Sequence, residues 1–338
     1  MAIELSNLTF TEQNDTVFGV EAIVNTGTAN TLAGNDIITG IITGSERFAI
    51  RNSGTINTGV GNDRITGICD ENATNSSGGI RNEGGTINTD DGNDIIIGSG
   101  QSGDGILTLV GTINTGDGDD QIIGTAIDSG INVNTQGIIN TGSGSDTITG
   151  IGGYGLQNYF TINTGDGNDK ITGHGTLSGG YGIINDGTMD TGAGNDTITG
   201  TNANGWGIDN DGTMDTGDGN DIIIGIGTLG IHNDGIIKTG NGKDSIIGDG
   251  GFNGTGNVFL EDGKDYLKGF GNGSFNGGNA QDALELTSGS YTVGISGTAV
   301  NFTKGSTVMN TAEFEILIAG NAIYNFASLT NGQTITIA

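Results

Sequence analysis

Apolar and polar residues alternate along many short stretches of this chain, with a period of two residues. One clear unit has such stretches at residues 182–185, 188–191 and 197–199, the last ending at Gly200. Between them stand Asp186-Gly187 and the glycine-rich run 192–196, which have the composition of tight turns. The pattern predicts three short strands per unit, joined by three corners.

The unit recurs along the chain, and its most constant feature is an Asp followed two places later by Ile or Leu. The recurring residues are Asp36, Asp63, Asp94, Asp120, Asp146, Asp169, Asp196, Asp221, Asp244, Asp265 and Asp282. They stand 17 to 31 residues apart, a period typical of solenoids in which each repeat is one supersecondary unit. We therefore predict an all-β fold, a parallel β-helix solenoid of about eleven coils. The crossover rule for parallel strands favours a right-handed helix.

The extent of the repeats predicts three segments. Residues 1–19 are irregular and are expected to form an N-terminal cap, residues 20–282 the parallel β-helix repeat domain, and residues 283–338 a C-terminal cap of antiparallel strands. The first segment carries Glu4, Glu12 and Asp15 and no apolar run of signal-peptide length. No stretch of the chain approaches the length of a transmembrane helix, so we expect no membrane insertion.

The composition narrows the classes of function. The chain has 69 glycines and no proline, which excludes collagen and suits a backbone that turns tight corners. A hydrophobic content of 33% is low for a globular core but sufficient for a thin solenoid core. The formal net charge of −29 argues against nucleic acids and anionic membranes as partners. Cys69 is the only cysteine, so no intrachain disulfide can form.

The glycine-rich corner has the chemistry of a calcium site. Each Gly-x-Gly-x-Asp loop supplies backbone carbonyls and one carboxylate, and two stacked loops approach the six to eight oxygens that Ca²⁺ prefers. Mg²⁺ demands a stricter octahedron and fits such loops poorly. Without a cation, the carboxylates of adjacent coils repel one another. The expected ligand residues are Asp63, Asp94, Asp120, Asp146, Asp169, Asp196, Asp221, Asp244, Gly116, Gly118, Gly142, Gly144, Gly165, Gly167, Gly192, Gly194, Gly217 and Gly219.

The loops resemble the RTX, or haemolysin-type calcium-binding, nonapeptide Gly-Gly-x-Gly-x-Asp-x-apolar-x. Residues 58–66, 141–149, 164–172, 191–199 and 216–224 match it, except that Thr replaces the first Gly. The resemblance covers roughly residues 31–286. It implies calcium ions bound between coils. It also implies export by a type I system with an uncleaved C-terminal signal, and hence an extracellular or cell-surface location.

The chain departs from that family's pattern in ways that affect the expected sites. Only one corner of each coil carries a loop, so we expect at most one row of ions. Residues that break the loop pattern are Leu32, Ala33, Asp90, Glu261 and Ala280, and Lys243 and Lys264 add positive charge to late loops. The best sites are therefore expected between Asp120 and Asp221.

Other columns of residues predict structural or binding roles. Amides that recur at the first corner are expected to form a hydrogen-bonded ladder: Asn52, Asn82, Asn158, Asn185, Asn210 and Asn233. The third corner varies from coil to coil, for example at residues 68–78 and 174–181. Beside it, Tyr154, Tyr181 and Trp206 form either a stabilising aromatic stack or a platform for sugars.

Two alternative functions are disfavoured by the residues. An enzyme needs a base and a charge stabiliser in one groove. His174 and His232, the two histidines, fall at different coil positions, and no base is evident beside Arg51 and Arg81, which are expected to face outward.

Ice binding would need Thr and Asn in flat rows. The loop row has Asn at 35, 62, 93, 168, 195 and 220, but the position two earlier is not Thr: Ala33, Val60, Asp91, Asp166, Ala193 and Asp218. We expect a secreted or surface calcium-dependent solenoid with no catalytic role. A glycan-binding adhesin module is the alternative, with a cell-surface glycan or surface protein as its partner.

Overall fold

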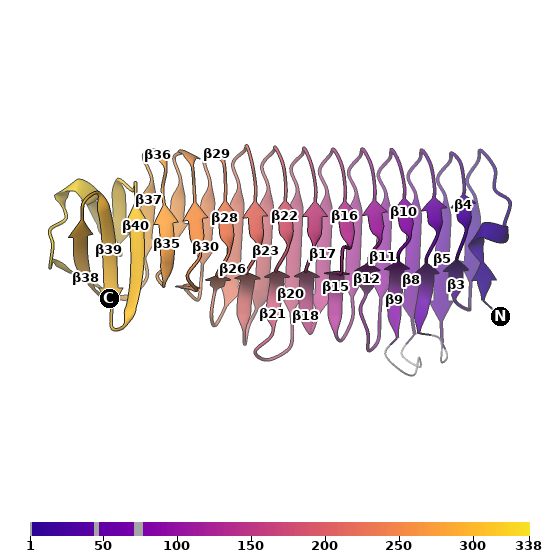
Figure 1. Ribbon diagram of the computed structural model, residues 1–338, viewed down its shortest axis with the longest axis horizontal. Helices are drawn as coiled ribbons and strands as arrows, with labels where there is room; N and C mark the ends of the chain where they lie inside the picture. Colours follow the sequence, from indigo (N-terminus) through magenta and orange to yellow (C-terminus); the bar gives the residue numbers. More distant parts are fainter. Residues whose placement is uncertain (1, 44–46, 71–76) are drawn as a thin grey trace.

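The structure is a computed structural model that describes residues 2–43, 47–70 and 77–338. The chain winds into an all-β parallel solenoid with its N-terminus at one end and a mixed β region at the other (Figure 1). The described residues contain no α-helix, only the 3-10 turns η1 (Leu5–Asn7) and η2 (Phe326–Ser328), and so no helix long and apolar enough to cross a membrane. The predicted fold class is confirmed.

Each coil contributes one strand to each of three sheets, which we number in chain order. The first sheet has 11 strands: β1 (Ile3–Glu4), β3 (Ile23–Asn25), β6 (Phe48–Asn52), β9 (Gly78–Glu83), β12 (Ile106–Leu109), β15 (Ser129–Asn134), β18 (Tyr154–Asn158), β21 (Tyr181–Asn185), β24 (Trp206–Asn210), β27 (Ile231–Asn233) and β31 (Phe252–Asn253).

The second sheet follows the first corner and precedes the glycine loop. Its solenoid strands are β4 (Thr28–Asn30), β7 (Thr55–Asn57), β10 (Thr86–Asn88), β13 (Thr112–Asn114), β16 (Ile138–Asn140), β19 (Thr161–Asn163), β22 (Thr188–Asp190), β25 (Thr213–Asp215), β28 (Ile236–Lys238), β32 (Asn257–Phe259) and β35 (Gly273–Asn276). It continues into the C-terminal region through β40 (Thr307–Ala312), β39 (Ala299–Lys304), β38 (Gly289–Ser296) and β43 (Thr334–Ile337).

The third sheet follows the glycine loop. Its strands are β2 (Thr16–Gly19), β5 (Ile37–Ile42), β8 (Arg64–Cys69), β11 (Ile95–Ser99), β14 (Gln121–Thr125), β17 (Thr147–Gly152), β20 (Lys170–Gly175), β23 (Thr197–Asn202), β26 (Ile222–Gly227), β30 (Ser245–Gly248), β34 (Tyr266–Lys268), β37 (Ala283–Leu286), β41 (Ile316–Ala319) and β42 (Ala322–Asn325). The loops themselves pair at one end through β29 (Asn241–Gly242), β33 (Asp262–Gly263) and β36 (Asn279–Ala280). β23 runs two residues past Gly200, where the sequence pattern placed its end.

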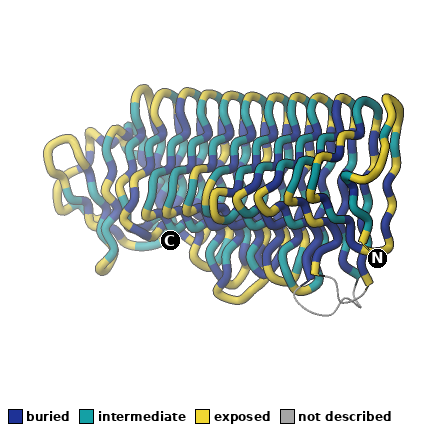
Figure 2. Tube along the Cα trace, turned by 45° about the vertical axis from the view of Figure 1, so that its right-hand side comes forward, coloured by how far each residue is buried: buried dark blue, intermediate teal, exposed yellow. Residues whose placement is uncertain are grey.

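The core is a set of apolar columns, one from each sheet. In one coil Ile183, Met189 and Ile198 are each fully buried, and equivalent positions above and below are aligned in register. Figure 2 shows these buried positions as continuous rows along the solenoid, with exposed residues at the corners. Alternation at period two therefore places one apolar side chain per strand in the core, and in the second and third sheets its neighbours are more exposed.

The predicted amide ladder is confirmed in two runs. Asn158 donates to Asn185, Asn185 to Asn210, and Asn210 to Asn233, each at 2.7 Å. A second run joins Asn52 to Asn82 at 2.9 Å, and begins one coil earlier at Asn25, which the sequence analysis did not include. Thr108 and Val133 take the equivalent places between the runs, and neither carries an amide.

The two ends differ from the regular coils. In residues 1–19, β1 and β2 pair in parallel with solenoid strands β3 and β5. At the other end β37 was expected to be antiparallel, but it pairs in parallel with both β34 and β41. The reason is that its Leu284 continues the buried column of Leu267. Antiparallel pairing does occur among β38, β39, β40 and β43. The variable corner at 68–78 lies partly outside the described residues.

Candidate metal centre

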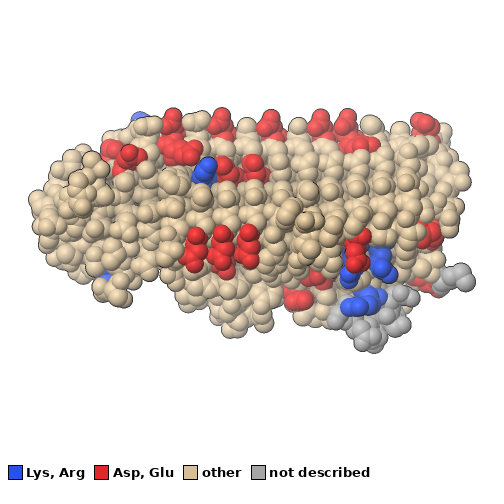
Figure 3. Space-filling model, viewed as in Figure 1, with Lys and Arg blue, Asp and Glu red and all other residues tan. Residues whose placement is uncertain are grey.

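The glycine loops stack into one rim of the solenoid, and their glycines have a backbone conformation that other residues rarely adopt. Gly165 has φ 82° and Gly167 has φ 156°, and the equivalent glycines of the neighbouring coils have similar values. Figure 3 shows acidic side chains in a row along this rim, where Figure 1 places β29 and β36. The structure thus brings the predicted loop glycines together in two parallel columns.

The glycines are needed because each lies directly over a carbonyl oxygen of the previous coil. A Cβ on Gly165 would lie 1.9 Å from the carbonyl oxygen of Gly142, and one on Gly167 would lie 1.6 Å from that of Gly144. The same cradle exists at the loops containing Gly116, Gly118, Gly192, Gly194, Gly217 and Gly219. Two carbonyls per loop therefore point along the solenoid axis toward the next coil.

Each loop Asp is buried and binds the backbone of its neighbour. The Oδ1 atom of Asp169 accepts the backbone N–H of Asp146 at 2.8 Å, and Oδ1 of Asp196 accepts that of Asp169 at 2.8 Å. The pattern runs without a break from the N–H of Asp15 to the carboxylate of Asp282. Sequence reasoning predicted the column but not this bonding, which resembles that of the amide ladder.

The second carboxylate oxygen of each column Asp lacks a hydrogen bond of normal geometry, although a Thr hydroxyl of the same loop lies near the carboxylate in every coil from Asp63 to Asp244. These are the Oδ2 atoms of Asp36, Asp63, Asp94, Asp120, Asp146, Asp169, Asp196, Asp221, Asp244, Asp265 and Asp282, all in side chains at most 2% exposed. A buried carboxylate oxygen without a donor is unfavourable, so it calls for either a proton or a cation. The same arrangement recurs in each column Asp from Asp36 to Asp282.

The pKa values of the column aspartates lie above the ordinary value of an Asp side chain. Burial raises the pKa of Asp94, Asp169 and Asp244 to about 7, against the opposing effect of a Thr hydroxyl and a backbone N–H. Burial likewise raises the pKa of Asp120 and Asp221 to about 6. Neighbouring column carboxylates raise these values further because like charges lie close together.

In the loops of Gly219 and Gly242, a backbone carbonyl and Oδ1 of the column Asp lie near the same glycine. The place where a Cβ of Gly219 would sit is 1.4 Å from the carbonyl oxygen of Gly194 and 3.1 Å from Oδ1 of Asp221. At Gly242 the corresponding distances are 1.4 Å to the carbonyl of Gly219 and 3.1 Å to Oδ1 of Asp244. The candidate metal-ligand atoms are all oxygens, and each loop includes one carboxylate oxygen without a hydrogen bond of normal geometry. Such a set of oxygen ligands fits a hard cation such as Ca²⁺.

Four non-glycine residues in the loops have the left-handed backbone conformation that glycine favours. Leu32, Asp90, Glu261 and Ala280 have φ values of 76°, 58°, 66° and 100°. The loop shape is therefore imposed by stacking on the neighbouring coils, and the four side chains are strained by it.

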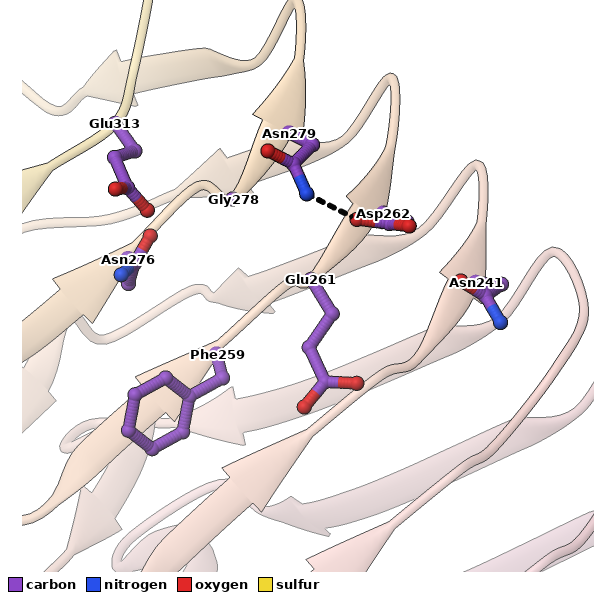
Figure 4. A pocket seen from close by; sticks show the side chains of 8 residues that line it. All are labelled: Asn241, Phe259, Glu261, Asp262, Asn276, Gly278, Asn279 and Glu313. Atoms are coloured by element: carbon purple, nitrogen blue, oxygen red, sulfur yellow. Dashed lines mark hydrogen bonds between the residues drawn. The ribbon is translucent and has the colours of Figure 1, made fainter.

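A polar pocket lies where the loop row meets the C-terminal region. Figure 4 shows Glu261 and Glu313 pointing into it, and Asn279 donating to Asp262 at 2.5 Å. Lys243, in the preceding loop, donates its backbone N–H to Asn220. The acidic and amide groups of this pocket extend the oxygen-rich rim to the end of the array.

The aromatic residues of the third corner divide into two contacts. Tyr154 and Tyr181 stack, with ring centroids 6.1 Å apart, whereas Trp206 packs edge-on against His232 at 5.1 Å. His174 lies in the third sheet and bonds Thr201, so the two histidines are on different sheets as expected. Trp206 therefore does not extend the stacked tyrosine pair.

A regular face on the second sheet escaped the sequence analysis. Most of its strands repeat Thr-x-Asn in register. One row contains Thr28, Thr55, Thr86, Thr112 and, after an interruption by Ile138, Thr161. The other row contains Asn30, Asn57, Asn88, Asn114, Asn140 and Asn163. Amides in the second row bond one another, as Asn114 does to Asn88 at 2.7 Å. The sequence signal for this face is the repeated Thr-Ile-Asn triplet at residues 55–57, 86–88, 112–114 and 161–163.

Comparison with known proteins gives one informative likeness. No family model matches the chain, and no curated protein matches it. One solved structure is described as a hyperactive, Ca²⁺-dependent, β-helical antifreeze protein from an Antarctic bacterium. It is 18% identical, with a TM-score of 0.50, over 84% of this chain and 77% of that one. At this identity the likeness supports the β-solenoid fold, which is compatible with RTX-like repeats.

Proposed function

We propose that this protein is a calcium-binding β-solenoid of the RTX type whose stability depends on Ca²⁺ bound along the aspartate column. The observation that carries the proposal is the unbroken series of buried Oδ2 atoms without a hydrogen bond of normal geometry, in loops whose glycine carbonyls face the next coil. A bound Ca²⁺ supplies positive charge that offsets the repulsion between stacked carboxylates. The Ca²⁺ dependence of the structural neighbour supports this reading.

Calorimetry on the chelator-treated protein tests the proposal directly. We expect heat on titration with Ca²⁺ and much less with Mg²⁺, because the loops are rich in carbonyls and too irregular for a strict octahedron. The number of bound ions measured by elemental analysis should fall in Gly167→Val, which fills the space over the Gly144 carbonyl. Absence of any Ca²⁺ heat, or an ion count equal to that of the parent, would refute the assignment.

We further propose that the protein works outside the cell as a structural or interaction module and not as an enzyme. The RTX-like loops and the acidic charge of −29 support export into a calcium-rich medium. Type I secretion predicts that deletion of a C-terminal segment abolishes export from a host carrying such a system. Export that survives this deletion would contradict the proposed route.

A second candidate function is binding to ordered water at an ice surface. The Thr-x-Asn face favours it, because hydroxyls, methyls and amides repeat there at the strand spacing of about 4.8 Å. The row of glycine-loop residues, whose sequence disfavoured ice binding, lies on a different surface from this face. The structural neighbour is described as an antifreeze protein, which makes the test worthwhile.

Thermal hysteresis and ice shaping in the presence of Ca²⁺ distinguish this candidate. Thr112→Tyr places a bulky ring in the middle of the face and should abolish most of any activity. Thr199→Tyr makes the same change on the third sheet and should leave the activity intact. If the parent protein shows no hysteresis, or if both variants lose it equally, the face does not bind ice.

A further inference from the structure

The few basic residues of this acidic chain are not evenly distributed. Ten Lys and Arg stand against 39 Asp and Glu. Arg47, Arg51 and Arg81, three of the four arginines, line one recess on the outer face of the first sheet. Figure 3 shows basic side chains gathered there beside an acidic group, toward the N-terminal end.

Strand register brings two of the guanidinium groups side by side. Arg51 on β6 and Arg81 on β9 are direct partners in adjacent parallel strands, and Val24 occupies the same place on β3. Adjacent strands lie about 4.8 Å apart, a spacing at which two arginines can contact the separate oxygens of one oxyanion group.

The floor of the recess is apolar and holds one arginine in place. Phe48 is only 6% exposed, and the guanidinium carbon of Arg81 lies 5.3 Å from its ring centroid. Gly78, the register partner of Phe48, leaves room for the ring, since a Cβ there would lie 2.4 Å from Phe48 Cε1. Phe48 therefore lies beneath Arg81, and the partly exposed Val24 offers apolar surface beside the positive charges.

One carboxylate partly offsets this charge. Glu83 accepts from Nε of Arg81 at 2.9 Å, and this bond, followed by the charges of Arg81 and Arg51, lowers the pKa of Glu83. Arg47 and Arg51 are exposed and form no ion pair within the described part of the chain. Among the described residues that line the recess, three carry a guanidinium group and one carries a carboxylate.

We propose that this recess binds an acidic sugar through its carboxylate or sulfate group. Arg51 and Arg81 contact the oxyanion, Arg47 adds charge at the rim, and the carbon face of the sugar packs on Val24 beside Arg81. Guanidinium groups suit this role because their planar donors match carboxylate and sulfate oxygens. Elsewhere the acidic surface repels such ligands, which restricts binding to this place.

Calorimetry with the calcium-saturated protein at low salt tests the site. The probes are D-glucuronate and glucose 6-sulfate, with glucose as the neutral comparison and inorganic sulfate to test the apolar floor. We expect the two acidic sugars to bind at one site, glucose not to bind, and inorganic sulfate to bind at least tenfold more weakly. Whichever acidic sugar binds more tightly identifies the favoured oxyanion.

The chain offers a matched control for the arginines. Arg51→Gln should weaken the acidic sugars at least tenfold. Arg64→Gln removes the same charge from β8 on the third sheet and should leave affinity unchanged. Chemical-shift changes at Arg51 Nε–H in the parent protein provide a readout that needs no variant. Absence of binding, equal affinity for inorganic sulfate, equal loss in both variants, or unshifted Arg51 signals would each overturn the proposal.

Discussion

The two oxygens of each column aspartate have different surroundings, and this asymmetry determines what the residue can do. Oδ1 of Asp196 is satisfied by the backbone N–H of Asp169, as an amide oxygen would be. Oδ2 lacks a hydrogen bond of normal geometry. Asn would preserve the first contact, so only the second oxygen explains why a charged residue stands at this position in every coil.

Asp169→Asn should therefore have opposite effects with and without calcium. In chelator the change removes a buried charge whose pKa burial has raised to about 7, so the melting temperature should stay the same or rise. In Ca²⁺ the variant loses a ligand to the ion and should melt below the parent. Asp166→Asn, an exposed change in the same loop, is the control and should show neither effect. Destabilisation of equal size in both conditions would mean that the column is purely structural.

Two glycines of nearly equal φ allow two effects of substitution to be separated: the clash of a Cβ with the carbonyl of the neighbouring coil, and the strain of a left-handed backbone. Gly192 has φ 76° and a Cβ there would lie 2.1 Å from the carbonyl of Gly165. Gly179 has φ 74° and has open space around it. Gly179→Ala should cost about 1–2 kcal/mol from the left-handed conformation alone, and Gly192→Ala about 1–3 kcal/mol more from the clash. Chemical denaturation of both variants measures the difference, and equal losses would show that the loops do not stack closely.

At the level of elements, the sequence predicted what depends on local periodicity. Three strands per coil, the glycine loops and the amide ladder all follow from patterns within one repeat. The parallel pairing of β37 did not, because it depends on which neighbour covers Leu284 and not on the strand itself. The recess around Arg51 was equally hidden, since it requires Phe48 and Gly78 to be aligned across coils.

Loop positions that lack glycine are places where the protein should be open to stabilisation. Glu261 is held at φ 66°, and no side-chain hydrogen bond within the described structure compensates for it. Glu261→Gly should raise stability by about 1 kcal/mol by relieving this strain. Glu12→Gly, an exposed change outside the positive-φ positions, should give no gain. Thermal melts of the two variants in Ca²⁺ decide the matter, and no gain for Glu261→Gly would contradict the account of the loop.

Over the whole molecule, the solenoid gains stability mainly from contacts between neighbouring coils. Under the proposed calcium binding, an ion between two loops strengthens one such interface, so several ions act together along the array. Each site stabilises the folded state by about 2.7 kcal/mol at a hundredfold excess of Ca²⁺ over its Kd. Loss of these terms leaves a glycine-rich chain whose ordering entropy opposes folding.

Calcium-coupled folding predicts a large effect of chelator on the whole protein. We expect the melting temperature to fall and much of the β circular dichroism signal to be lost when Ca²⁺ is removed at pH 8, and both to return on addition of Ca²⁺. A full β spectrum with an unchanged melting temperature in chelator would show that the apolar columns and the amide ladder suffice.

The stability gained from calcium should increase with pH. Burial raises the pKa of Asp94, Asp169 and Asp244 to about 7 in the folded state, above their ordinary value. Between about pH 4 and 7 the folded chain therefore binds more protons than the unfolded chain, so stability in chelator falls as the pH rises. Ca²⁺ requires the ionised carboxylates, so the calcium-dependent gain grows over the same range.

Melting curves from pH 5 to 8, with Ca²⁺ and with chelator, test this expectation. The two curves should lie close together at pH 5 and separate as the column ionises, with the largest gap above pH 7. General repulsion within a chain of charge −29 also weakens in acid, but 0.5 M KCl screens exposed charges far more than the buried column. The gap should therefore survive added salt. A chelator curve that is flat in high salt would mean that the column does not titrate in this range. A gap between the curves that is independent of pH would place calcium on groups other than these aspartates.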